Sequence, residues 1–455
     1  MKYKKYLNTV RNWLNKSMGI DEAVAISVAG KSWQIVTGLV NIILIAQFTS
    51  GYEQGYLYTF QGLMAFQILF DLSLSSILTQ FAGHEMAKLY WENGRIVKGE
   101  LFAKSRLASI FKVCLIWFTI ASVMMFLILS KGGYVFFEIK ALPNDNVDWQ
   151  MPWIAICLAA SLSLIMTPVI GLIEGCGRIV EVAKFRITQD VISAFVFWVA
   201  LICEFKLYAV SLLFFSRLII QIAYLIFVKR QFLCDIMFTV ITDKIHFMEE
   251  IWPFQWRFVI CALASLIAAS LTMPIVFATQ GPIVAGKFGM SLSVASAIMP
   301  VSMVWINTKV PTFCNLVALK QYEVLDTLFN KTLKYSVNIT LIISSCLLCL
   351  IMLAYHLFPS LSVKLADPIV VIILIISAIS SLPNLTASTY LRAHKLEVTM
   401  IANMTVAIAT VCTIYLAAQI GNLLHIALIM SVGNVVLSVW VYILFKKYKK
   451  EWHKN

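Results

Sequence analysis

The sequence has 455 residues, of which 60% are hydrophobic and only 13% are charged. A soluble globular domain has roughly 25% charged and about 45–50% apolar residues, so this composition excludes a protein surrounded by water on all sides. The formal net charge of +13 does not indicate nucleic-acid binding, because the basic residues gather in the connections between apolar segments. The composition therefore predicts a membrane protein with no nucleic-acid partner.

The chain begins with a basic segment of mixed polarity that lacks the apolar core of a cleavable signal. We expect residues 1–22 to form a cytoplasmic or interfacial arm, with Trp13 and Leu14 turned toward lipid.

Apolar segments long enough to cross a bilayer recur along the rest of the chain. A spanning helix needs about 20 mostly apolar residues to cross roughly 30 Å of hydrocarbon. These segments are continuously apolar, whereas the strands of a membrane barrel alternate in polarity. We expect an all-α polytopic protein with twelve spanning helices, over residues 23–48, 55–81, 107–130, 152–174, 187–204, 208–228, 257–279, 283–308, 335–357, 367–391, 397–418 and 422–445.

Lysine and arginine are concentrated at both ends of the chain and in every second connection between the predicted spans. The remaining connections hold few of them, namely Lys131, Lys140, Lys206 and Lys364. The positive-inside rule then places both termini in the cytoplasm, as an even number of spans requires. The extracytoplasmic connections are short, the longest being 131–150, so no folded domain is expected on that side.

Signatures of catalysis are absent from the sequence. It has no GxxxxGK[ST] phosphate-binding loop, no HExxH or GxSxG motif and no pair of CxxC motifs, and its ten cysteines lack metal-ligand spacing. We expect no enzymatic activity, no cofactor and no metal.

Two short similarities between the halves of the chain indicate an internal repeat. Residues 177–182 (GRIVEV) correspond to residues 393–398 (AHKLEV) at two predicted cytoplasmic corners, and Gly55 corresponds to Gly286 at the start of spans two and eight. Transporters are often built from two such halves. The boundaries that follow are 23–228 for an N-lobe of six spans, 229–256 for a cytoplasmic connection, 257–445 for a C-lobe of six spans and 446–455 for a basic tail.

Several charged residues fall within the predicted spans, where each costs at least about 2.5–3.5 kcal/mol on insertion scales. Lys31 and Gln34 are three residues apart and share one helical face, as Gln67 and Asp71 do at a spacing of four. In one interpretation the basic residues line a cavity that attracts an anion and the acidic ones balance charge or couple an ion. In the other, each pairs locally, reaches an interface or bridges helices. The basic candidates are Lys31, Arg217, Arg257 and Lys287, and the acidic ones are Asp71, Glu174 and Asp190.

A stretch around the second predicted span resembles a known family. Gly51–Phe60 (GYEQGYLYTF), with Ala65–Gln67, Asp71–Leu74 and Gln80–Glu85, resembles Wzx-type polysaccharide flippases of the multidrug/oligosaccharidyl-lipid/polysaccharide (MOP) exporter superfamily. The length, the twelve spans and the Gly177–Arg178 corner are also similar. Asp71 stands where the family leads us to expect glutamate, although the acid is kept.

The resemblance implies a MATE-like fold of two six-helix lobes and a flippase activity. The substrate would be an O-antigen or related repeat unit on undecaprenyl pyrophosphate, carried across the bacterial inner membrane by alternating access through a cationic central cavity. The four basic candidates would contact this substrate, while membrane lipid would hold its tail. Na⁺ or H⁺ coupling, a polysaccharide polymerase and a chain-length regulator are further expected partners.

Two alternatives stay open at this stage. An ion-coupled multidrug exporter of the same superfamily would share the fold, but a cavity for cationic drugs is expected to be acidic. An O-antigen polymerase or ligase is also a long apolar chain, but such enzymes carry a large extracytoplasmic loop, and residues 131–150 are too few for one.

Overall fold

The computed structural model describes residues 22–71, 74–140, 147–242, 252, 259–260, 263, 266, 270–307, 309–357, 363–394 and 398–452. Within these residues, ten helices are long and apolar enough to cross a membrane, which confirms the all-α polytopic architecture. The predicted arm at residues 1–22 falls almost wholly outside the described residues, as does part of the predicted span at 257–279.

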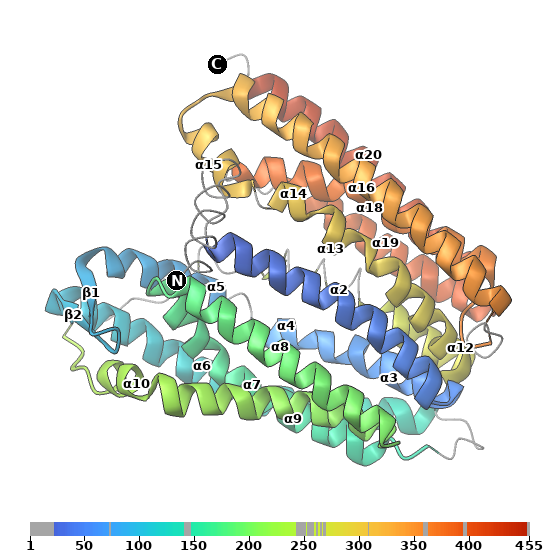
Figure 1. The fold of residues 1–455 in the computed structure, drawn as a ribbon, viewed down its shortest axis with the longest axis horizontal. Helices are drawn as coiled ribbons and strands as arrows, with labels where there is room; N and C mark the ends of the chain where they lie inside the picture. Colours follow the sequence, from blue (N-terminus) through green and yellow to red (C-terminus); the bar gives the residue numbers. More distant parts are fainter. Residues whose placement is uncertain are drawn as a thin grey trace, which may run out of the picture.

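The N-terminal half forms one bundle, drawn from blue to green in Figure 1. Its neighbouring helices pack in the pairs α2 with α8, α5 with α7, α6 with α7, α7 with α9 and α8 with α9. Its elements are α2 (Glu22–Phe48), α3 (Gly51–Met64), η1 (Ala65–Gln67), α4 (Ile68–Asp71), α5 (Leu74–Glu85), η2 (Met86–Lys88), β1 (Leu89–Glu92), β2 (Ile96–Gly99), α6 (Leu101–Lys140), α7 (Gln150–Gly175), α8 (Ile179–Ile202), α9 (Tyr208–Ala223), the π-helical turn η3 (Tyr224–Val228) and α10 (Arg230–Met237).

The C-terminal half forms a second bundle, drawn from yellow to red. Here α20 packs against both α18 and α19, and α12 and α16 pack against α18. Its elements are α12 (Thr272–Ser296), α13 (Ile298–Ser302), α14 (Val304–Asn307), α15 (Val310–Ala318), α16 (Tyr322–Leu357), α18 (Pro368–Ala393), α19 (Met400–Gln419) and α20 (Leu423–Trp452).

The second helix of each bundle is broken at a corresponding place. The predicted continuous span 55–81 is in fact α3, η1, α4 and α5, and after a turn at Gly281 (φ 82°) the C-terminal bundle has a helix to Ser296 followed by the short α13, α14 and α15. The break within 55–81 removes one predicted span, and the joining of two predicted spans through Gly281 removes another. Ten described helices therefore meet the spanning criterion where the sequence predicts twelve. Interrupted helices at matching positions of two halves indicate where a transporter binds its substrate.

The two bundles meet where α3 packs against α12, and they separate toward the end that carries the start of α2 and the end of α20 (Figure 1). Glycines permit this crossing. A Cβ on Gly55 would lie 2.0 Å from the carbonyl oxygen of Pro282, and one on Gly286 would lie 2.8 Å from that of Gly51. The two glycines paired by the repeat therefore lie where backbone of one lobe meets backbone of the other, and we call this end of the bundles the closed end.

Two further contacts hold the closed end together. Tyr56 of α3 and Phe277 of α12 pack edge to face at 5.0 Å, within a fully buried aromatic cluster. The Nζ of Lys364, in the C-terminal half, donates hydrogen bonds to the carbonyl oxygens of Ala46 and Thr49 at the end of α2. A cation at this position also interacts favourably with the negative end of the helix dipole.

A β-hairpin that the sequence analysis did not predict lies between α5 and α6. Asn93 and Gly94 both have positive φ (50° and 68°), as the central residues of a type I′ turn require. Together with Arg95 they join β1 to β2, in which Leu89 lies opposite Gly99. The indole of Trp91 donates to the carbonyl oxygen of Cys176 (2.7 Å), so the hairpin caps the corner between α7 and α8.

The first half of the predicted outer connection 131–150 is helical, because α6 continues to Lys140. The division of the chain at 229–256 and 446–455 remains a prediction.

Candidate functional site

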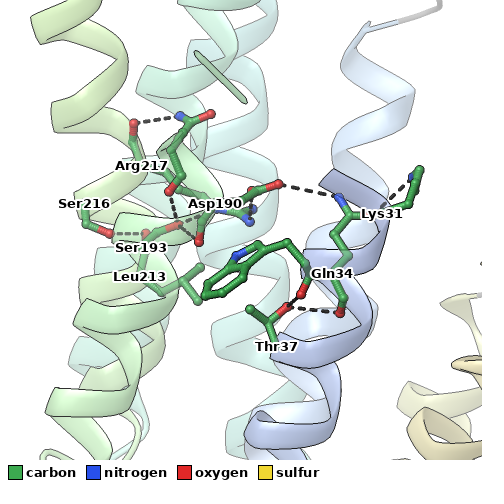
Figure 2. Close-up of polar contacts among 10 residues, drawn as sticks. Lys31, Gln34, Thr37, Asp190, Ser193, Leu213, Ser216 and Arg217 are labelled. Carbon is green, nitrogen blue, oxygen red and sulfur yellow. Dashed lines mark hydrogen bonds and ion pairs between the residues drawn. The ribbon is translucent and has the colours of Figure 1, made fainter. Parts of the chain in front are cut away.

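A chain of polar contacts crosses three helices of the N-terminal half (Figure 2). The ammonium of Lys31 donates to Oε1 of Gln34 (3.2 Å), and Nε2 of Gln34 donates to Oδ2 of Asp190 (3.5 Å). Nη2 of Arg217 donates to Oδ1 of the same carboxylate at 2.8 Å. We call Lys31, Gln34, Asp190 and Arg217 the N-lobe network; it joins α2, α8 and α9.

Neighbouring side chains hold Arg217 in place. Its Nε donates to Oγ of Ser193 (3.4 Å), one turn along α8 from Asp190, and its carbonyl oxygen accepts from Nε2 of Gln189 (2.8 Å). The side chains of Arg217 and Asp190 keep 43% and 25% of their surface exposed, so both remain accessible. Because Asp190 neutralises Arg217, Lys31 supplies the net positive charge of the network.

A small pocket of about 250 Å³ adjoins this network between α5, α7, α8 and α9. Gln189 lines the pocket and bonds to Arg217, so it links the two features. Across the pocket, Nη2 of Arg186 lies 2.7 Å from Oε2 of Glu174. The sequence predicted Glu174 as a charge-balancing acid but treated Arg186 only as a topological charge of a connection.

The other predicted residues lie apart from this group. Asp71 accepts hydrogen bonds from Oγ (2.9 Å) and the backbone nitrogen (3.3 Å) of Ser75, and it forms no ion pair with any residue that the structure describes. Lys287 lies on α12, partly buried, without an ion pair or side-chain hydrogen bond inside the described ranges. Arg257 lies outside the described residues.

The structure thus brings together three of the seven predicted residues: Lys31, Asp190 and Arg217. Glu174 reaches the adjoining pocket. The roles of all seven in binding or coupling stay predictions.

No protein-family model matches this sequence, and no curated protein matches it either. Solved structures do match over nearly the whole chain. An inward-facing multidrug resistance MATE family transporter of the MOP superfamily superposes with a TM-score of 0.67 at 13% identity, covering 92% of this chain and 99% of that one.

An outward-facing MATE transporter of the same superfamily gives a TM-score of 0.57 at 14% identity, with 95% of this chain and 96% of that one covered. The lipid II flippase MurJ, in an inward closed conformation, gives 0.60 at 13% identity, with 93% and 87% covered. The chain therefore has the fold of MOP superfamily transporters, as the resemblance implied; identities this low establish the fold alone.

Proposed function

We propose that the protein is a flippase that carries an oligosaccharide linked to undecaprenyl pyrophosphate across the bacterial inner membrane. The observation that carries the proposal is the N-lobe network, an accessible cation and a hydrogen-bonded arginine set inside a transporter fold. One of the matched structures is a lipid II flippase, which supports a lipid-linked substrate.

The depth of the network supports a role beyond packing. Asp190 and Arg217 lie near the middles of the candidate spans Ile179–Ile202 and Tyr208–Val228, where exposure of charge to lipid is costly. The helix that presents Lys31, α2, packs against α8 on one side and against α12 and α13 of the other half. Charges on such a helix are best accommodated by a hydrated space between the lobes, where they attract a pyrophosphate.

The mechanism we propose is alternating access. The lobes are joined at the closed end and apart at the other, and the TM-score is higher for the inward-facing than for the outward-facing transporter. If both termini are cytoplasmic, as the basic residues predict, the pyrophosphate enters from the cytoplasm and contacts Lys31 and Arg217 while the lipid tail stays in the bilayer. Release then requires α3 and α12 to separate.

A multidrug exporter is the second candidate, since two matched structures are multidrug transporters. The carboxylates of Asp190 and Glu174 favour it, because they would bind a cation or a coupling proton once freed from their arginines. Lys31 disfavours it, since the structure places no acid against it among the described residues.

Complementation in the host tests the proposal. Deletion of the gene is expected to abolish the surface polysaccharide ladder and to accumulate lipid-linked repeat units inside. Lys31→Ala and Arg217→Ala, at matched membrane levels, should restore little of the ladder.

The control is Lys112→Ala, which alters a lysine of α6 that donates instead to the carbonyl oxygen of Thr239 (3.3 Å); this variant should restore the ladder. If the ladder survives deletion and drug sensitivity changes, the multidrug exporter replaces the flippase.

A further inference from the structure

The C-terminal half contains a larger cavity that none of the predicted site residues lines. It lies between α14, α18, α19 and α20 and has a volume of about 560 Å³, within the range of about 300–1,000 Å³ typical of ligand pockets. Four asparagines from four different helices line it, namely Asn307, Asn384, Asn403 and Asn434.

These asparagines retain unused hydrogen-bonding groups. Oδ1 of Asn384 accepts from Ser388 (3.2 Å), which leaves its two N–H donors, and Nδ2 of Asn434 donates to the carbonyl oxygen and Oγ of Ser377 (3.2 and 2.9 Å), which leaves its Oδ1 acceptor. No described residue bonds to the side-chain amide of Asn403. The cavity therefore presents donors and acceptors together.

The chemistry of the lining selects a class of ligand. None of the described residues that line the cavity is acidic, so a cationic drug or a metal ion would find no countercharge there. Sugar hydroxyl and acetamido groups each donate and accept hydrogen bonds, and side-chain amides match them in both roles. Serines and threonines such as Ser381, Thr389 and Thr410 extend the polar wall.

The position of the cavity relates it to the N-lobe network. The helices around it are the second, fourth, fifth and sixth of the C-terminal half, and the pocket beside Gln189 lies between the same four helices of the N-terminal half. The two halves thus offer equivalent places with different chemistry: an ion pair in one, and side-chain amides with one basic residue, Arg392, in the other.

We propose that the cavity in the C-terminal half is a glycan subsite that holds sugar residues while the N-lobe network holds the pyrophosphate. This inference rests on the proposed function and adds where the sugar binds. It requires that the amides contribute to affinity only when the carrier bears an oligosaccharide.

Binding to the full-length protein in lipid nanodiscs tests the subsite. The two probes are bare undecaprenyl pyrophosphate and the same carrier bearing the host's own repeat unit. The test variant is the double substitution Asn384→Leu and Asn403→Leu. The control is Asn338→Leu, at an exposed position of α16 away from the cavity, and thermal unfolding confirms that both variants are folded.

We expect the double variant to lose roughly 30-fold in affinity for the glycosylated carrier, as two hydrogen bonds of ordinary strength predict, and to bind the bare carrier like the wild type. Arg217→Ala should weaken both probes. Equal affinity of the double variant and the wild type for the glycosylated carrier would overturn the subsite and leave the flippase standing. An equal loss on both probes would also overturn it, and a wild type that binds neither probe would remove the flippase together with the subsite.

Discussion

Gly55 offers the sharpest test of how the two lobes are held. In Gly55→Ala the new Cβ would lie 2.0 Å from the carbonyl oxygen of Pro282, whereas real Cβ contacts essentially never fall below 3.0 Å. The two helices α3 and α12 must therefore move apart by about 1 Å. Since a Cβ is fixed to the backbone of its own residue and the atom that it meets is a backbone oxygen, no side chain can turn away to relieve the clash.

The energetic consequence follows from the cost of overpacking. Forcing extra atoms into a packed contact costs about 1–3 kcal/mol. This free energy shifts the equilibrium by about 5- to 150-fold toward conformations in which α3 and α12 are separated. Hydrogen exchange measured by mass spectrometry on the full-length protein in nanodiscs reports this directly. Peptides from α3 and α12 should exchange faster in Gly55→Ala, while peptides from α16 should not change.

Gly132→Ala is the matched control, because a Cβ on that glycine of α6 meets nothing within 4 Å. It carries the same helix-propensity gain of roughly 0.5–1 kcal/mol from replacing glycine by alanine without any clash. If Gly55→Ala exchanges no faster than Gly132→Ala in α3 and α12, the glycine crossing does not hold the lobes together and the reasoning fails.

Three other contacts can be tested by substitution. Gly133→Ala places a Cβ 2.3 Å from a buried indole ring and should lower stability by about 1–3 kcal/mol in thermal unfolding, whereas its neighbour Gly132→Ala should not; equal midpoints would contradict this. Lys364→Met removes a charged donor worth about 1.5–3 kcal/mol and should speed hydrogen exchange at the end of α2, and unchanged protection there would show that the contact does not hold the lobes. Asp190→Asn frees the charge of Arg217 and should raise affinity for bare undecaprenyl pyrophosphate about fivefold; weaker binding would show that the carboxylate does not act as a competing countercharge.

The sequence by itself determined that the chain is a polytopic helical membrane protein, since a run of about 20 apolar residues has few other stable states. It also located two turns between helices. The predicted boundary between spans at 279 and 283 falls on the turn at Gly281, and the Gly177 corner has the positive φ of 84° that favours glycine. The shared face of Lys31 and Gln34 is likewise a local property of helix geometry, and their hydrogen bond confirms it.

Only the tertiary structure decided which polar groups meet. Asp190 lies 27 residues from Arg217 and 156 from Gln34, and helical periodicity assigns a residue to a face without naming its neighbour. The same limit hid the partner of Glu174 and the four asparagines of the C-terminal half, each of which is unremarkable in its own helix. The closed end shows the reason. Gly55 and Gly286 correspond in the internal repeat of the sequence, but their close approach depends on the crossing of α3 and α12. Packing between segments that are distant in the sequence sets that crossing.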